Sequence, residues 1–251
     1  MGVVMSNVPS LRFSEFSGYW NQVRLSSIAT FSKGKGISKS DISDDGNTEC
    51  IRYGELYTHY KELIVDIKSK TDTPEDELVL SEEGDIIIPA SGEAAIDIAT
   101  ASCVLKQGVA LGGDLNIIKS DQNSLFLAYC LNNSKKHDIA RLSQGVSVVH
   151  LYGSQLASLS LNLPSITEQQ KIAAFLTAVD TKIEQLTQKE ALLKQYKKGV
   201  MQKLFSQEIR FKADDGSEFP EWTTRKLGDV FSGHKGQGLS KDDISPTGKY
   251  P

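Results

Sequence analysis

The sequence predicts a mixed α/β (α+β) domain, followed by a long coiled-coil helix and then by a truncated repeat of the first domain. Three observations support this prediction. Short apolar runs separated by Gly, Asn, Asp and Ser fill the first part of the chain, apolar residues recur every seven positions across 172–204, and residues 20–46 return without a gap at 222–248. We therefore expect boundaries at residues 1–163, 164–206 and 207–251.

The composition is that of an ordinary packed protein. The chain has 251 residues, of which 39% are apolar, and a net charge of −4. No apolar run approaches the roughly 20 residues that a membrane span needs, and the N-terminus lacks signal-peptide features, so we expect a cytoplasmic protein without a membrane partner. Cys50, Cys103 and Cys130 have no metal-binding or redox spacing, which favours reduced and mostly buried thiols.

The first domain is expected to combine short strands with short helices. Its apolar runs alternate in part and in part are continuous, which is typical of strands buried on one or both faces. We expect strands at 63–67, 78–80, 85–88, 103–105 and 115–118, and helices at 125–132 and 136–142.

A long helix follows Pro164. Thr167 suits an N-cap, and Gln170, three residues later, would complete a capping box. A helix from 168 to 205 would be about 57 Å long at 1.5 Å per residue. An apolar stripe of this length needs a helical partner, although an ordinary amphipathic surface helix is the alternative. The stripe consists of Ile172, Leu176, Val179, Ile183, Leu186, Leu193, Val200 and Leu204, with Glu190 and Lys197 interrupting one row.

The repeat is long enough to be a duplicated domain. Trp20 matches Trp222, the Lys33-Gly34-Lys35-Gly36 segment matches Lys235-Gly236-Gln237-Gly238, and with small gaps residues 11–16 resemble 209–211 and 217–219. Solenoid repeats have periods of roughly 20–50 residues, whereas this period is about 200. We expect the chain to end inside its second domain, either as a fragment or as a natural half that completes itself with a second copy.

No catalytic or cofactor motif is present in the sequence. A Walker-type phosphate loop and an HExxH motif are both absent, and the four histidines are isolated. The carboxylates at 75–77 and 82–85 are better explained as solvated acidic turns than as a metal site. We therefore expect a protein that is not an enzyme by itself and has no cofactor.

The charge distribution permits an anionic partner. Residues 41–86 contain 14 acidic against 4 basic residues, a balance of −10, which leaves the rest of the chain at +6. A dense negative charge such as nucleic acid can therefore meet a basic part of the surface. The acidic segment keeps open an alternative function, a coiled-coil adaptor whose globular head binds protein.

The helix entry and the repeat together resemble the specificity subunits of type I restriction-modification systems. The resemblance rests on the repeat of a domain plus a helix, on residues 145–151, and on the motif formed by Leu163, Pro164, Glu168, Gln169, Ile172, Leu176, Asp180 and Ile183. It implies target recognition domains that each read one half of a bipartite double-stranded DNA site, with an antiparallel helix pair as spacer. It also implies that chemistry resides in the methyltransferase subunits and, through them, the restriction subunit.

This chain departs from the family pattern because it lacks a second long helix. We expect a two-fold symmetric homodimer in which two copies of the helix pair antiparallel, or else a truncation without biological meaning.

The residues expected to contact DNA are basic, polar or glycine residues in turns. Such side chains bind phosphates and base edges, and glycines let backbone N–H groups approach a phosphate. For each segment a plain structural turn is the alternative, and the target sequence stays unassigned. The candidates are Lys33, Gly34, Lys35, Lys39, Arg52, Tyr53, Ser91, Gly92, Ser143, Gln144 and Ser147.

Overall fold

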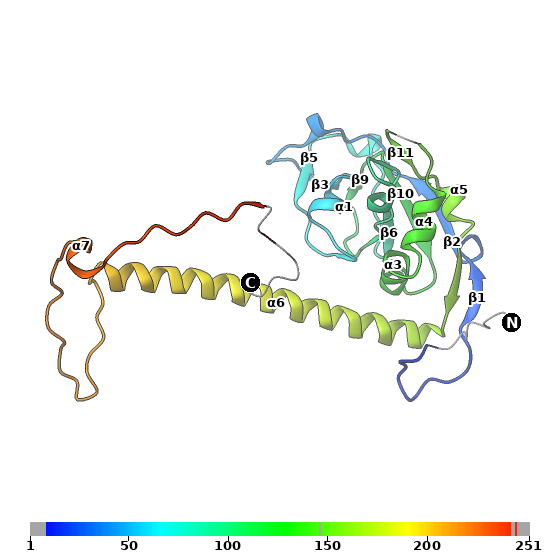
Figure 1. Cartoon of the computed structure of the whole chain (residues 1–251). Helices are drawn as coiled ribbons and strands as arrows, with labels where there is room; N and C mark the ends of the chain where they lie inside the picture. The colour runs from blue at the N-terminus through cyan, green and yellow to red at the C-terminus, as the bar shows by residue number, and fades with distance from the viewer. Residues whose placement is uncertain (1–8, 146, 242–243, 245–251) are drawn as a thin grey trace. The chain divides into compact units, whose positions relative to one another are not determined.

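The computed structural model describes residues 9–145, 147–241 and 244. The chain consists of two compact units, residues 1–186 and 187–251. The first unit holds the sheets and most helices; the second holds the end of the long helix and the segment after it (Figure 1). Residues 242, 243 and 245–248 of the repeat, and Val146 in the quoted family motif, lie outside the described residues.

A five-stranded sheet forms the centre of the first unit. Its strands pair antiparallel except β4 with β8, which are parallel. Their order is β2 (Ala29–Lys33), β10 (Leu115–Ser120), β6 (Asp85–Pro89), β8 (Ser102–Val104) and β4 (Leu63–Ile64).

Three smaller sheets surround this centre. The first pairs β5 (Ser69–Thr71), β3 (Thr48–Ile51) and β9 (Ala110–Leu111); the second pairs β7 (Ser91–Gly92) with β11 (Val149–His150); the third pairs β1 (Asn21–Arg24) with β12 (Ser160–Leu163). The last pair joins the two ends of the domain, so β12 leads directly into the long helix.

The helices of the first unit are short, with one exception. The short ones are α1 (Glu55–Thr58), α2 (Ala95–Ile98), α3 (Ser124–Asn132), α4 (Lys136–Leu142) and α5 (Gly153–Leu156), with 3-10 turns η1 (Leu25–Ser27), η2 (Lys39–Asp41) and η3 (Glu75–Glu77). The exception, α6, spans Ile166–Phe205, and α7 (Leu227–Val230) lies in the second unit (Figure 1).

The central sheet separates two hydrophobic clusters because side chains alternate along a strand. In β6, Ile86 and Ile88 join the cluster formed with α3, α4, α5 and the start of α6, whereas Ile87 joins the cluster on the opposite face. In β10, Ile118 and Ile117 divide in the same way. Burial on both faces explains why these strands are continuous apolar runs.

Most predicted elements of the first domain are confirmed. Strands occupy the runs at 85–88, 103–105 and 115–118 and the start of 63–67, and helices occupy 124–132 and 136–142. The strand expected at 78–80 is wrong. Only Leu80 forms an isolated bridge, to Ala110, because this segment leaves η3 and contacts the short β9 through scattered backbone hydrogen bonds.

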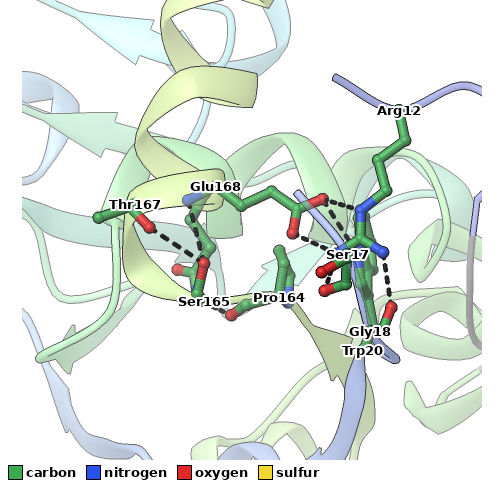
Figure 2. Close-up of polar contacts among 9 residues, drawn as sticks. Arg12, Ser17, Gly18, Trp20, Pro164, Ser165, Thr167 and Glu168 are labelled. Carbon is green, nitrogen blue, oxygen red and sulfur yellow. Dashed lines mark hydrogen bonds and ion pairs between the residues drawn. The ribbon is translucent and has the colours of Figure 1, made fainter. Parts of the chain in front are cut away.

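The predicted capping box at Thr167 and Gln170 is also wrong. The helix begins at Ile166, and the Ser165 hydroxyl accepts the Glu168 N–H at 3.4 Å, so Thr167 lies inside the first turn (Figure 2). Ser165 has the same capping chemistry as Thr167 and precedes Glu168 by three residues. The Glu168 carboxylate does not turn back to close a box, since Arg12 and Trp20 bind it.

The predicted long helix is confirmed as a single helix of 40 residues. Across the residues that the structure describes, no helix is both long and apolar enough to cross a membrane.

Candidate nucleic-acid interface

The Lys33–Gly36 turn is held against the Gly112-Gly113 segment by backbone contacts. Gly34 N–H donates to Leu115 O and Lys35 N–H donates to Leu111 O, both at 3.0 Å. A Cβ on Gly34 would lie 2.1 Å from the Gly112 carbonyl oxygen, a distance that no side chain tolerates. Close approach therefore requires glycine here, and it fixes where Lys33 and Lys35 leave the sheet.

Arg52 lies on the other side of Gly112. A Cβ on that glycine would lie 3.8 Å from Arg52 Cγ, so the arginine stem packs on the Gly112 backbone. The Arg52 Nε is buried and has no hydrogen-bond partner among the described residues. Its backbone N–H donates to the buried Glu55 carboxylate at 2.7 Å, which orients the turn. A buried guanidinium donor without a protein partner is costly.

An aromatic pair links Arg52 to the β7 strand. The rings of Tyr53 and Tyr57 meet edge to face at 6.2 Å, and the Tyr57 hydroxyl donates to Ser91 O at 3.1 Å. Burial raises the pKa of Tyr57 above its ordinary value, helped by Tyr53, Asp97 and Asp114.

The Ser91-Gly92 strand continues the surface to the 143–152 segment. Ser91 pairs with His150 and Gly92 with Val149, and Gln144 exchanges backbone hydrogen bonds with His150 at 2.9 and 2.7 Å. The His150 ring stacks on Tyr152 at 6.4 Å, and the Lys33 ammonium lies 5.9 Å from the Tyr152 ring centroid.

These contacts close a ring that starts and ends at Lys33. Four segments far apart in the sequence, with Gly112-Gly113 as support, thus form one surface. We call it the loop face: residues 33–36, Arg52, Tyr53, Tyr57, Ser91, Gly92, Gln144, His150 and Tyr152. Beside it is a hollow of about 550 Å³ lined by residues 36–39, Asp41, Arg52, Tyr53 and 112–114. Lys39 therefore lies at the hollow, as do two carboxylates.

The local electrostatics are mixed rather than uniformly basic. The Ser38 hydroxyl, and then its backbone N–H, donate to Asp41 and hold the pKa of that carboxyl below its ordinary value. Lys39 and Arg52 therefore share the hollow with the carboxylates of Asp41 and Asp114.

Two candidate residues lie at the margin of the loop face. The Ser143 hydroxyl donates to Ala140 O at 2.6 Å, so it caps the end of α4 in this structure. Ser147 is exposed in the tight turn before β11.

Sequence reasoning missed the aromatic members Tyr57, His150 and Tyr152, and the Gly112-Gly113 support. The last two aromatics belong to or directly follow the quoted family motif, and the paired glycines precede a predicted strand. The family motif and the paired glycines are both visible in the sequence, but Tyr57 and Tyr152 make contacts with residues more than 30 positions away in the chain.

The α6 stripe divides into a packed part and an exposed part. Ile172 packs against the core, and Leu176 lines a hollow at the start of the helix. Farther along, Leu186 and Leu193 are 53% and 56% exposed. The remaining stripe positions are Val179 and Ile183, which are exposed, and Val200 and Leu204, which are half-buried. Exposed Phe175, Leu192, Tyr196 and Phe205, absent from the predicted stripe, widen this apolar surface.

The start of α6 is fixed to the domain by the Glu168-Gln169 pair. Arg12 donates from Nε and Nη2 to the two Glu168 oxygens at 2.8 and 2.7 Å, and Trp20 Nε1 donates at 3.3 Å (Figure 2). Arg12 also binds the carbonyl oxygens of Ser17 and Gly18. Glu168 is 1% exposed, so this motif residue has a structural role as the anchor of the helix.

Comparisons with known proteins all find specificity subunits or domains of type I restriction-modification systems. Residues 18–195 match the family described as "Type I restriction modification DNA specificity domain". The type I restriction enzyme MjaVIII specificity subunit of Methanocaldococcus jannaschii is 25% identical over 260 residues, which cover 99% of this chain and 59% of the relative. The putative MjaX specificity subunit of the same organism is 29% identical over 127 residues, covering 47% of this chain and 30% of that protein.

Solved structures show the same fold. The S subunit of a type I restriction-modification system from M. genitalium superposes with a TM-score of 0.51 at 18% identity, covering 80% of this chain and 48% of that one. The HsdS subunit from Thermoanaerobacter tengcongensis gives 0.50 at 16% identity, covering 76% and 45%. The chain therefore spans less than two thirds of each of these relatives.

Proposed function

Because the chain belongs to the family of type I restriction-modification DNA specificity domains, we propose that it is a noncatalytic subunit that recognises double-stranded DNA through the loop face. One observation carries the proposal: turn residues from distant parts of the chain converge on one surface around Arg52, whose stem packs on the Gly112 backbone. Arg is the side chain most suited to bidentate contacts with guanine edges and with phosphates.

The other members of the loop face fit the same partner. Lys33 and Lys35 supply ammonium groups for phosphates, while Tyr53, Ser91 and Gln144 supply polar groups for base edges or sugars. Phosphate contacts position a protein and base contacts specify sequence. We assign the lysines to the first role and Arg52 to the second.

The proposed assembly uses the three segments at 1–163, 164–206 and 207–251. The first is a target recognition domain, the second a spacer helix and the third the beginning of a second recognition domain. Two copies pair antiparallel through the α6 stripe, and such a dimer reads a bipartite, two-fold symmetric site, since protein symmetry is mirrored in the half-sites. Methyltransferase subunits, and through them a restriction subunit, supply the chemistry.

Binding of the purified full chain to a labelled duplex library, followed by fluorescence anisotropy at 50–200 mM salt, tests DNA recognition. We expect log affinity to fall linearly with log salt, with a slope of about −0.9 per phosphate contact. Selection from the library then identifies the half-site. The same titration is repeated with methyltransferase subunits present.

Arg52→Ala should weaken binding to the selected duplex roughly 5- to 150-fold, because one bidentate base contact is worth roughly 1–3 kcal/mol. Its thermal unfolding is measured alongside, because truncation also removes the packing of the Arg52 stem on Gly112. Arg24→Ala is the matched control: Arg24 is exposed and precedes β2, whereas the loop face begins at the last residues of that strand.

Two results would contradict the proposal. DNA affinity independent of salt, or absent with and without methyltransferase subunits, would favour the protein-binding adaptor that the acidic segment 41–86 allows. Equal losses in the Arg52 and Arg24 variants would remove the loop face from the binding site.

A further inference from the structure

The segment after α6 repeats the arginine arrangement seen at the start of the chain. Arg210 Nη2 donates to the carbonyl oxygens of Phe219 and Pro220 at 3.0 and 2.5 Å, just as Arg12 binds those of Ser17 and Gly18. The two carbonyl pairs lie at the same distance before Trp222 and Trp20. The structure thus aligns two arginines that the sequence aligns only with a gap.

The first of these arrangements, which we call the leader clasp (residues 11–20), holds α6 by several contacts. Arg12 and Trp20 bind Glu168, Phe13 meets Phe175 edge to face at 6.0 Å, and Glu15 forms an ion pair with Lys171. All three α6 residues lie within its first three turns. The clasp therefore recognises the beginning of this helix in particular.

The second arrangement, which we call the repeat clasp (residues 209–222), has the corresponding side chains, but they contact different partners. Arg210 pairs with the adjacent Glu221 at 3.0 Å, and the Glu221 side chain is 85% exposed. Phe211 is 73% and Trp222 53% exposed. Glu218, the counterpart of Glu15, pairs with Lys212 at 3.6 Å. Phe211, Glu218 and Trp222 of the repeat clasp are thus largely exposed, whereas Arg210 is 23% exposed and Trp222 meets Phe205 edge to face at 6.3 Å.

The chemistry that fits the repeat clasp is a helix start with a glutamate, a lysine three residues later and a phenylalanine four residues after that. The sequence contains this pattern once, as Glu168, Lys171 and Phe175. Within one chain Arg210 cannot reach it: Glu168 lies about 56 Å from the end of α6 along the helix. The five residues from Phe205 to Arg210 span at most about 18 Å.

We propose that the repeat clasp of one copy docks on the start of α6 of a second copy, in exchange with that copy's own leader clasp. This inference rests on the proposed antiparallel pairing of α6, which brings the end of one helix beside the start of the other. The leader clasp leaves a largely apolar hollow of about 340 Å³ against α6, lined by residues including Phe13, Trp20 and Phe175, so its packing is incomplete. A competing segment of the same chemistry can replace it.

Zero-length carbodiimide cross-linking of the full chain tests the exchange. A mixture of ¹⁵N-labelled and unlabelled protein should give a mixed-isotope cross-linked peptide between Lys171 and Glu218, alongside the Lys171–Glu15 product expected from the leader clasp. Glu15→Gln should raise the yield of the mixed peptide several-fold, since it removes the competing carboxylate. Glu218→Gln, the matched control in the other clasp, should abolish it.

Tryptophan fluorescence gives an independent readout, since Trp20 and Trp222 are the two tryptophans of the chain. In Trp20→Phe, acrylamide quenching of Trp222 should fall at least twofold as the protein dimerises on concentration. In Trp222→Phe, quenching of Trp20 should rise over the same range. Adding Glu168→Gln to Trp20→Phe should restore the accessibility of Trp222.

Light scattering on the same samples separates failure of this inference from failure of the proposed function. A dimer in which Lys171 never cross-links to Glu218 between copies, with Trp222 as accessible as at high dilution, overturns the exchange but leaves helix pairing intact. A chain that stays monomeric overturns both the exchange and helix pairing, while DNA recognition is judged by its own titration.

Discussion

Gly34 gives the sharpest test of how the loop face is built. Its φ lies outside the left-handed region, so backbone conformation does not require glycine there. The requirement is steric, because a Cβ would lie 2.1 Å from Gly112 O and 2.3 Å from Leu111 O. Ordinary contact begins near 3.4 Å, so Gly34→Ala must displace the turn by about 1 Å.

The expected cost follows from that displacement. Overpacking of a well-packed site costs about 1–3 kcal/mol. The displacement also weakens the hydrogen bonds from Gly34 and Lys35 to Leu115 and Leu111, each worth about 0.5–1.5 kcal/mol net. We expect Gly34→Ala to lose about 2–4 kcal/mol of unfolding free energy.

Urea denaturation followed by circular dichroism measures this loss, and hydrogen exchange at Lys35 and Gly113 locates it. Gly54→Ala is the matched control, because Gly54 has φ −64 and nothing within 4 Å of a new Cβ. Alanine there should be neutral or stabilising by up to about 1 kcal/mol. A Gly34→Ala variant within about 0.5 kcal/mol of the parent chain, with unchanged exchange, would refute the steric argument.

Three further predictions probe other parts of the chain. Leu186→Asp places a charge on the exposed stripe and should abolish self-association in a light-scattering dilution series while leaving the first domain folded. Ala191→Asp, on the exposed opposite side of the helix, is its control, and persistence of the Leu186→Asp dimer would contradict helix pairing. Ile87→Ala should destabilise by about 2–5 kcal/mol in urea denaturation, because Ile87 is fully buried in the cluster opposite α3; a smaller loss would mean that this cluster can collapse around the cavity. Burial raises the pKa of Cys50 to about 11 and that of Cys103 to about 12. Neither thiol should therefore react with a disulfide reagent at pH 8 before the protein unfolds. Stability should fall as the pH rises above about 9, because the unfolded thiols ionise there and the folded ones do not. Serine or alanine variants of both cysteines should lose less stability between pH 8 and 10, and fast native labelling would contradict the burial.

Local patterns predicted the elements whose cause is local. The apolar run at 85–88 and the seven-residue spacing from Ile172 to Val200 indicate a buried strand and a long helix by themselves, and both are present. The helix start was misplaced by two residues, because Ser165 and Thr167 are each followed three residues later by a residue able to complete a capping box. Only the contact of Glu168 with Arg12 distinguishes them, and that contact joins residues 156 positions apart.

The sequence indicates several residues of the loop face but not the contacts between them. Charged and glycine turns identified Lys33, Arg52 and Ser91 from the sequence. Nothing local indicates that Tyr57 reaches Ser91, or that Lys33 lies over Tyr152, because these contacts depend on how the central sheet brings distant turns to one edge. Whether these residues contact DNA stays a prediction, as does the pairing role of the stripe.

The burial of β6 on both faces has a practical consequence for protein engineering. Because Ile86, Ile87 and Ile88 fix the register of the central sheet from its interior, the turns that leave its edge can be altered without touching the framework. A combinatorial library that randomises Tyr53, Ser91 and Gln144, and keeps Gly34, Gly92 and Gly112 for their close approaches, would sample new surface chemistries on an unchanged scaffold. Display selection of this library against chosen duplexes would then measure how far the proposed DNA contacts of the loop face can be redirected.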